Sequence, residues 1–163
     1  MRRSLTTALA AAVLLTAGCA FLNPEKIPTG TPAADLQSRF GPPTGEYALP
    51  GGGKRLEYAR GPYGKQTWMF DLDAGGRLAK TAQVLTEANF NTIRRGMGRD
   101  EVLAAIGRPG ETSRIGWQDQ TVWSYRYETP FCQWFQVGIS PSGQVVDSGY
   151  APDPLCDVSL MGV

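Results

Sequence analysis

The stretch GMGRDEVLAAIGRP, residues 96–109, has the pattern of a short helix with a glycine near each end. Asp100 and Glu101 fall in the expected first turn, where the helix dipole favours negative charge. Apolar residues follow at helical spacing, and Gly107 can end the helix in a backbone conformation that other residues rarely adopt. The stretch GTPAADLQSRFGPP, residues 30–43, keeps the same glycines and final proline in register. The sequence therefore predicts that one helical unit is repeated.

The two copies are expected to begin their helices differently. In the earlier copy, Thr31 is the expected N-cap and Pro32 the first helical residue, where a missing amide hydrogen does no harm. In the later copy, Gly98 is the expected N-cap, although it has no side-chain acceptor. Helices this short are not stable alone, so each must pack against other elements.

After each helix the apolar residues change from helical to alternating spacing, which predicts strands. The first copy continues with KRLEYA, QTWMFDL and RLAKTAQV, and the second with TVWSYRY, QWFQVGI and QVVDSGY. With one inserted residue, Tyr58 aligns with Tyr125 and Trp68 with Phe135. The turn sequences DAGG and SPSG precede the last strand of each copy. Each copy therefore predicts an antiparallel meander.

The second copy also has a preceding amphipathic segment, LTEANFNTI, in which Thr86 can cap a helix. We therefore predict an α+β fold of two tandem repeats, each of short helices followed by an antiparallel β-meander. The first αβ repeat is expected over residues 30–82 and the second ααβ repeat over residues 83–150. Residues 151–163 are expected to form a C-terminal tail.

The amino-terminal residues have the pattern of a signal peptide, expected over residues 1–18. Two arginines precede an apolar run that is too short to span a bilayer. The last residues, LTAGC, resemble the lipobox of bacterial lipoproteins, which implies cleavage before Cys19 and a lipid anchor on that cysteine. By the sorting rule of enterobacterial lipoproteins, Ala20 implies the outer membrane. The alternative is an ordinary secretory signal with a coincidental cysteine, and residues 19–29 are expected to be the lipidated end and its tether.

The charge balance does not favour nucleic acid as a partner. The chain has 16 basic and 15 acidic residues, and removing the signal peptide takes away Arg2 and Arg3. The formal charge of the mature chain is then near −1, without the basic excess that nucleic-acid binding requires.

The residues available for chemistry are few. The chain has no histidine, which removes the commonest general base and metal ligand. With Cys19 lipidated, Cys132 and Cys156 form an even pair that favours a disulfide in an oxidising compartment; two free buried thiols are the alternative. We therefore expect no catalytic residue, no metal site and no cofactor.

Aromatic residues in loops are the remaining candidates for binding. The segments GPYGK and TPFCQ occupy the same hairpin position in the two copies and carry Tyr63 and Phe131. Such residues often dominate protein interfaces, although both side chains could instead fold back onto the sheet. Trp134 alternates with Phe135, so it is expected on the face away from the core, where a tail held by the disulfide can cover it. Tyr63, Phe131 and Trp134 are thus the candidate partner-binding residues.

The run IRRGMGRDEVLAAIGRP, with WSYRY after it, resembles the SmpA/OmlA (BamE-like) family of outer-membrane lipoproteins. The resemblance covers residues 85–150, and its glycine-methionine, valine and glycine-x-proline positions fall on Gly96, Met97, Val102, Gly107 and Pro109. It implies two helices followed by a three-stranded antiparallel sheet, a lipid anchor and a periplasmic location. The tandem arrangement is similar to that of secreted β-lactamase inhibitor proteins.

These observations together predict a non-enzymatic outer-membrane lipoprotein, facing the periplasm, that acts as a protein-binding scaffold in the cell envelope. Its expected partners are the membrane, through the lipid anchor, and envelope proteins. The family resemblance implies an accessory role in assembling outer-membrane β-barrel proteins. The alternative is an inhibitor or binding module for a periplasmic enzyme.

Overall fold

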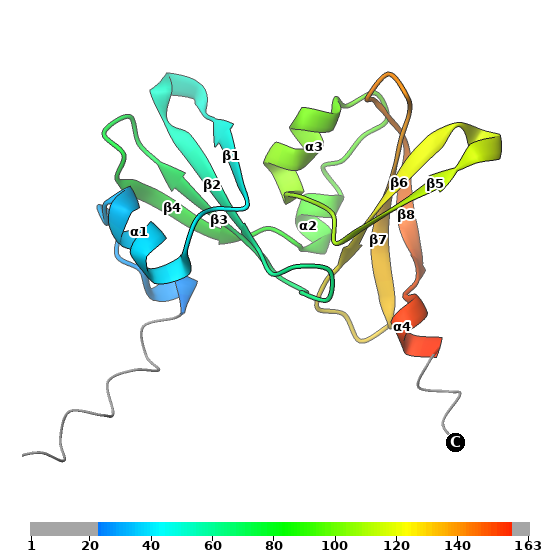
Figure 1. Cartoon of the computed structure of the whole chain (residues 1–163), viewed down its shortest axis with the longest axis horizontal. Helices are drawn as coiled ribbons and strands as arrows, with labels where there is room; N and C mark the ends of the chain where they lie inside the picture. The colour runs from blue at the N-terminus through cyan, green and yellow to red at the C-terminus, as the bar shows by residue number, and fades with distance from the viewer. Residues whose placement is uncertain (1–22, 158–163) are drawn as a thin grey trace, which may run out of the picture.

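The structure, a computed structural model, describes residues 23–157. The expected signal peptide and Cys19 lie outside the described residues. Two four-stranded antiparallel sheets and a few short helices form a mixed α+β fold, seen side by side in Figure 1. No helix among the described residues is long and apolar enough to cross a membrane.

The elements follow one another in a regular order. The first unit comprises the 3₁₀ helix η2 (Pro24–Lys26), α1 (Ala33–Phe40), β1 (Gly45–Ala48), η3 (Pro50–Gly52), β2 (Lys54–Ala59), β3 (Thr67–Leu72) and β4 (Leu78–Gln83). The second unit comprises α2 (Glu87–Phe90), α3 (Arg99–Ile106), β5 (Glu111–Ile115), η4 (Gly116–Gln118), β6 (Gln120–Arg126), β7 (Gln133–Ile139), β8 (Val145–Pro152) and α4 (Pro154–Asp157). Within each sheet the strands lie in sequence order, so each sheet is a meander.

The helices α1 and α3 begin with the same backbone geometry. Pro32 is the N-cap of α1 with φ −64° and ψ 148°, and Gly98 is the N-cap of α3 with φ −70° and ψ 149°. The expectation that Thr31 caps α1 and that Pro32 is its first helical residue is wrong by one position: the helix begins at Ala33, and the Thr31 hydroxyl donates to the Pro28 carbonyl at 2.7 Å. In α3 the Glu101 carboxylate accepts a hydrogen bond from the Gly98 amide at 2.7 Å, which is the glutamate half of a capping box.

Both helices also end in the same way. Gly41 after α1 has φ 79° and ψ −169°, and Gly107 after α3 has φ 79° and ψ −168°, a region that is almost exclusive to glycine. A tyrosine from the second strand of each sheet donates to each glycine carbonyl: Tyr58 to Gly41 at 3.2 Å and Tyr125 to Gly107 at 3.1 Å. Each helix is therefore fixed to its own sheet at this corner.

Each unit has its own hydrophobic core between its helices and one face of its sheet. The first core consists of Ile27, Leu36, Leu56, Trp68, Phe70, Leu72 and Leu78. The second is larger and consists of Leu85, Phe90, Ile93, Val102, Ile106, Trp123, Tyr125, Tyr127, Phe135, Val137, Ile139 and Val145. Ile27 comes from the segment expected to be a tether, so the chain already packs against the first sheet from η2 onward.

The outermost strands β1 and β5 were not expected, since the sequence and the family resemblance both implied three strands per sheet. The side chains of β5 are mostly exposed, and those of β1 alternate between half-buried and exposed. Edge strands of this kind have no apolar face that a sequence pattern could reveal.

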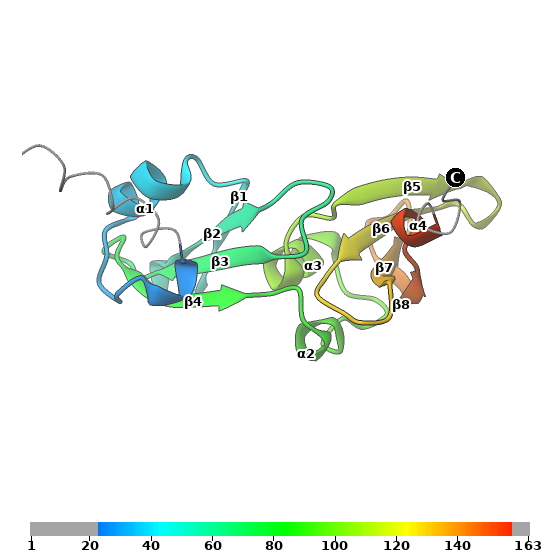
Figure 2. The same cartoon turned by 90° about the horizontal axis from the view of Figure 1, so that it is seen from below.

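The second unit covers the face of the first sheet that α1 leaves open, and α3 lies between the two sheets in Figures 1 and 2. Arg55 on this face pairs with Asp71 at 2.6 Å and donates to the Ala104 carbonyl of α3 at 2.7 Å. A β-carbon on Gly107 would lie 2.9 Å from Thr67 Cγ2, so the chain leaving α3 approaches β3 very closely. The two units therefore share a tightly packed joint.

Candidate binding surface

The loops that join β2 to β3 and β6 to β7 carry the two aromatic residues singled out from the sequence. Tyr63 is 72% exposed and Phe131 is 71% exposed, so neither side chain folds back onto its sheet. The two loops lie side by side, since Tyr63, Lys65 and Pro130 line one pocket of about 240 Å³. We call the pair of loops, residues 60–66 and 127–132, the loop platform.

Trp134, the third candidate, lies beneath the surface on the face of the second sheet away from the core. Its side chain is 6% exposed, and its indole N–H has no hydrogen-bond partner among the described residues. The guanidinium of Arg126 lies 4.9 Å from the centre of its ring, a distance suited to a cation–π contact. Trp134 therefore supports Arg126 and presents little area of its own to a partner.

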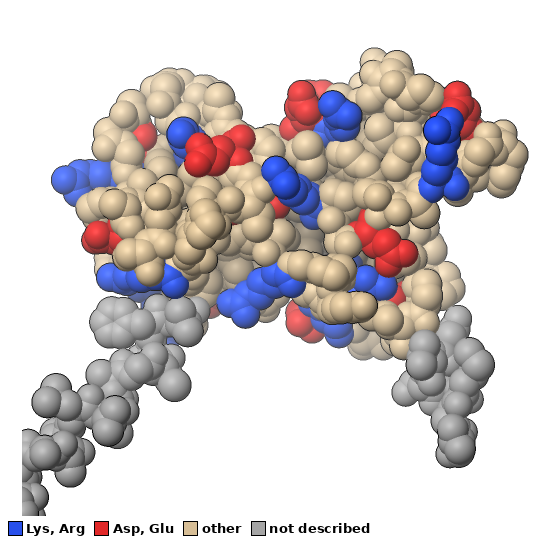
Figure 3. All heavy atoms as spheres, viewed as in Figure 1, with Lys and Arg blue, Asp and Glu red and all other residues tan. Residues whose placement is uncertain are grey.

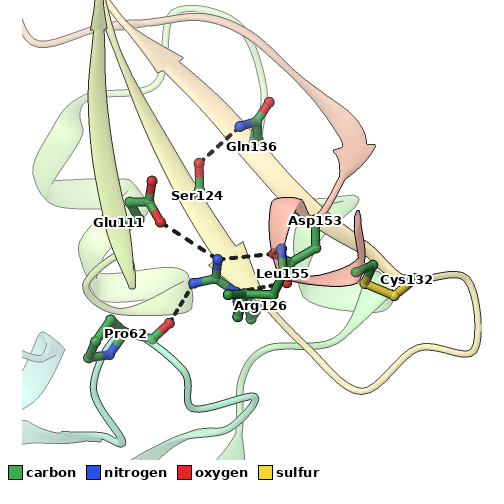
Figure 4. A network of polar contacts seen from close by, with 9 residues as sticks. Pro62, Glu111, Ser124, Arg126, Cys132, Gln136, Asp153 and Leu155 are labelled. Atoms are coloured by element: carbon green, nitrogen blue, oxygen red, sulfur yellow. Dashed lines mark hydrogen bonds and ion pairs between the residues drawn. A yellow bond between two sulfur atoms is a disulfide. The ribbon is translucent and has the colours of Figure 1, made fainter. Parts of the chain in front are cut away.

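Arg126 is the centre of a polar network beneath the loop platform, shown in Figure 4. Its Nε and Nη2 donate to the two carboxylate oxygens of Asp153 at 2.7 and 3.0 Å, a bidentate ion pair. Its Nη1 donates to the Pro62 carbonyl at 2.7 Å, and Glu111 of β5 lies 3.6 Å away. One side chain thus joins β6, the carboxyl-terminal segment and the loop of the first unit.

Sequence reasoning missed this network. Arg126 occupies a polar position of an alternating strand, where an arginine normally faces water, and no local pattern marks it as buried. The only sequence signal is indirect: a disulfide between Cys132 and Cys156 brings Asp153 back to the start of β7.

The electrostatics of the pair favour its ionised form. Burial raises the pKa of the Asp153 carboxyl, but hydrogen bonds from Arg126 and the Leu155 amide, together with the Arg126 charge, lower it more. The net result is a pKa below the ordinary value for aspartate. Asp153 therefore stays charged opposite Arg126 at neutral pH.

The expected disulfide between Cys132 and Cys156 is present, with a Cα–Cα distance of 6.1 Å. It ties α4 to the end of the β6–β7 loop. The Asp153 amide also donates to the Cys132 carbonyl at 3.1 Å, so the covalent link and the ion pair act on the same segment. Together they fix the base of the loop platform.

A second polar cluster lies inside the joint between the units. The Glu57 carboxylate is fully buried and accepts hydrogen bonds from the Thr44 hydroxyl at 2.9 Å and from the Tyr47 hydroxyl. Burial, followed by the hydrogen bond to Glu57 and the charge of that residue, raises the pKa of Tyr47, while Arg108 opposes this. Burial and the same carboxylate also raise the pKa of Tyr125. Because its oxygens are occupied by these donors, Glu57 acts as a fixed acceptor within the joint.

Next to this cluster, a cleft of about 320 Å³ opens between the two units, and we call it the inter-unit cleft. One wall is the β2–β3 loop, and the other is the segment that leads from α3 to β5. Its lining includes Gly61, Pro62, Gly64, Arg108, Gly110 and Arg126.

The most exposed large apolar side chain among the described residues, Trp117, lies elsewhere and was not anticipated. It is 85% exposed in η4, at the tip of the β5–β6 hairpin, where Arg114 and Asp119 form an exposed ion pair at 3.1 Å. The described residues contain no group of three or more cysteines, aspartates or glutamates placed to hold a metal ion.

Comparison with known proteins does not assign a family. No protein-family model matches the chain, and no curated protein matches it. A proposed β-lactamase inhibitor protein from Streptococcus mutans aligns over 80% of this chain and 88% of its own, with 13% identity and a TM-score of 0.32. A cysteine-rich secretory protein from Staphylococcus aureus aligns over 77% of this chain and 44% of its own, with 11% identity and a TM-score of 0.30.

An extracellular protein with an SCP domain from Bacillus anthracis aligns over 76% of this chain and 44% of its own, again with 11% identity and a TM-score of 0.30. The aligned part is therefore less than half of the last two proteins. Likenesses this weak carry no argument about the function of this chain.

Proposed function

We propose that this protein is a non-enzymatic scaffold of the cell envelope that binds other proteins through the loop platform. The observation that carries the proposal is the pair of exposed aromatic side chains, Tyr63 and Phe131, on adjacent loops with a fixed base. Aromatic residues give large contact areas at a small entropic cost, and rigid support reduces that cost further.

The fixed base is the second support for the proposal. Arg126 holds the Pro62 carbonyl beside Tyr63, and the disulfide holds Cys132 beside Phe131. A loop that is already in its bound conformation loses less freedom when a partner docks.

Tandem duplication is part of the same proposal: each repeat has short helices followed by an antiparallel β-meander. The support is the repeated geometry at the N-caps Pro32 and Gly98, and at the terminal glycines Gly41 and Gly107. Duplication explains why the two aromatic loops are equivalent hairpins on neighbouring sheets. A single repeat would offer only one of them.

The location belongs to the proposal as well. The lipobox-like end of the signal sequence supports cleavage before Cys19, lipidation of that cysteine and attachment to the periplasmic side of the outer membrane. Mass spectrometry of the purified protein's amino terminus tests this directly. A mature chain that begins at Cys19 and carries acyl groups supports the anchor, and an unmodified terminus elsewhere contradicts it.

The partners that we propose are envelope proteins, with the β-barrel assembly machinery first because of the SmpA/OmlA resemblance. The resemblance to β-lactamase inhibitor proteins favours the alternative, a soluble periplasmic enzyme. Affinity purification of the full-length protein from detergent-solubilised envelopes of its native host separates the two. Barrel-assembly components support the first reading, and a hydrolase supports the second.

The same experiment tests the loop platform when it is repeated with two matched variants. Removing both aromatic side chains, with Tyr63→Ala and Phe131→Ala together, is expected to reduce partner recovery at least about tenfold. Trp117→Ala removes an aromatic residue that is even more exposed, at 85%, from another hairpin and is expected to leave recovery unchanged. If the Trp117 variant loses the partner and the double variant keeps it, the loop platform is not the binding surface.

A further inference from the structure

The inter-unit cleft has walls that are already fixed in the free protein. Arg126 holds the Pro62 carbonyl at 2.7 Å, and the Gly110 amide donates to the Ser124 carbonyl at 3.0 Å. A β-carbon on Gly110 would lie only 3.0 Å from the Pro62 carbonyl oxygen, so the two walls meet closely at the bottom of the cleft. A partner would therefore enter a preformed space instead of having to open one.

The charge of the cleft has one sign. Arg108 and Arg126 are the only charged residues in its lining, and Arg126 is paired with both Asp153 and Glu111. Arg108 is exposed at the mouth, and Arg60 and Lys65, also exposed, flank the lining glycines of the β2–β3 loop. In Figure 3 basic side chains lie on both sides of the junction between the two halves, with acidic side chains near them.

Two carboxylates lie near the cleft without lining it. Glu111 of β5, whose side chain is 52% exposed, pairs with Arg126 at 3.6 Å. Glu57 is fully buried and accepts hydrogen bonds from Thr44 and Tyr47, and it does not line the cleft. An incoming anionic group therefore meets cations at the mouth and no acidic side chain in the lining.

We propose that the inter-unit cleft receives an acidic segment of the partner protein, with a carboxylate of that segment paired to Arg108. The inference rests on the proposed protein-binding function and adds the chemistry of the contact. A volume of about 320 Å³ is at the small end of ligand pockets, which suits one or two side chains of a peptide segment. Tyr63 lies next to the cleft in the same loop, so one partner surface can reach both.

The test uses the full-length mature protein labelled with ¹⁵N-glycine and two blocked pentapeptides. One has aspartate, phenylalanine and glutamate between terminal glycines, and the other has asparagine and glutamine in place of the two acids. The acidic peptide is expected to shift the amide signals of Gly61, Gly64 and Gly110. It is expected to bind about tenfold more tightly than the neutral peptide, with a difference that shrinks as salt is added.

Variants of the cationic residues locate the contact. Arg108→Ala is expected to weaken the acidic peptide about tenfold, and Arg108→Lys, which keeps the charge, to weaken it less. Arg114→Ala removes an exposed arginine from the β5–β6 tip and is expected to change nothing. The double variant Arg60→Ala with Lys65→Ala serves as a second test in exposed positions, in case Arg108→Ala disturbs the joint. It is expected to weaken the acidic peptide several-fold.

Three results overturn the proposal: equal affinity for the two peptides, no shift at the three cleft glycines, or equal effects of Arg108→Ala and Arg114→Ala. The proposed function can fail separately, because partner recovery with the Tyr63 and Phe131 variants does not involve the peptides. If partner recovery depends on those aromatic residues but the peptides give a negative result, the proposed acidic segment is wrong and the loop platform remains the proposed binding surface.

Discussion

Arg126→Ala is expected to lower the free energy of unfolding by about 3–5 kcal/mol. Its side chain is 6% exposed and that of Asp153 is 10% exposed, so the variant would leave a buried carboxylate without its cation. The Pro62 carbonyl would lose its donor as well. Removing one partner of a buried pair is far more damaging than removing an exposed pair, because the remaining charge is cut off from water.

Urea unfolding, followed by tryptophan fluorescence, measures the effect. With a typical urea dependence of about 2 kcal/mol per molar for a small protein, the midpoint should move down by roughly 2 M. Arg114→Ala is the matched control, because its ion pair with Asp119 is 75% and 66% exposed and should contribute less than about 1 kcal/mol. Similar midpoint shifts for the two variants would refute the assignment of Arg126 as the structural centre of the loop platform.

The pH dependence of stability gives an independent check on the same pair. The pKa of Asp153 is lowered by folding, so its contribution to stability is present above the unfolded-state pKa of about 3.9 and is lost as the pH falls through the folded-state pKa. Asp153→Asn should therefore be less stable than the natural protein at neutral pH, and the difference should shrink below about pH 4. A difference that stays constant from neutral to acid pH would show that Asp153 is not held in its ionised form.

Three further predictions concern the supports of the fold. The disulfide between Cys132 and Cys156 closes a loop with a sequence separation of 24, and its reduction should lower the unfolding free energy by about 3 kcal/mol. Urea unfolding with and without dithiothreitol measures this change. An unchanged midpoint would show that the disulfide does not contribute to stability. Gly41→Ala and Gly107→Ala introduce the same unfavourable φ, but only the second places a β-carbon against Thr67 Cγ2. In thermal unfolding, Gly107→Ala should therefore lower the unfolding free energy by at least about 1 kcal/mol more than Gly41→Ala. Equal losses would argue against close packing at the joint. The pKa of Tyr125 is raised by folding, so its contribution to stability is present below the unfolded-state pKa of about 10 and is lost as the pH rises above that value. Tyr125→Phe should therefore lose less stability at alkaline pH than the natural protein. If both lose the same amount, other groups cause the alkaline loss of stability.

Periodic and local patterns predicted much of the fold correctly. The alternation of Trp68 and Phe70 placed β3 in the first core, and the same pattern at Phe135 and Val137 placed β7 in the second. Thr86 accepts the hydrogen bond expected of an N-cap from the Asn89 amide at 3.3 Å. Patterns of this kind succeed because burial of one face repeats at a fixed spacing along the chain.

The binding surface was predicted only in part. Tyr63 and Phe131 follow from loop position alone, whereas Arg126 and Glu57 could not be assigned as buried from their neighbours in the sequence. A charged residue becomes buried only where a distant partner meets it, and Asp153 is 27 residues from Arg126. The edge strands β1 and β5 escaped prediction for a related reason: backbone pairing formed them without an apolar face.

By itself, the sequence determined the mixed α+β class, the glycine corners that end α1 and α3, and the cysteine pair, because each depends on residue type and short-range spacing. Only the tertiary structure decided how the second unit covers the open face of the first sheet, and which polar groups that contact buries. The physical reason is that the energy of a buried charge depends on the groups around it in space. Those groups come from parts of the chain that no local pattern connects.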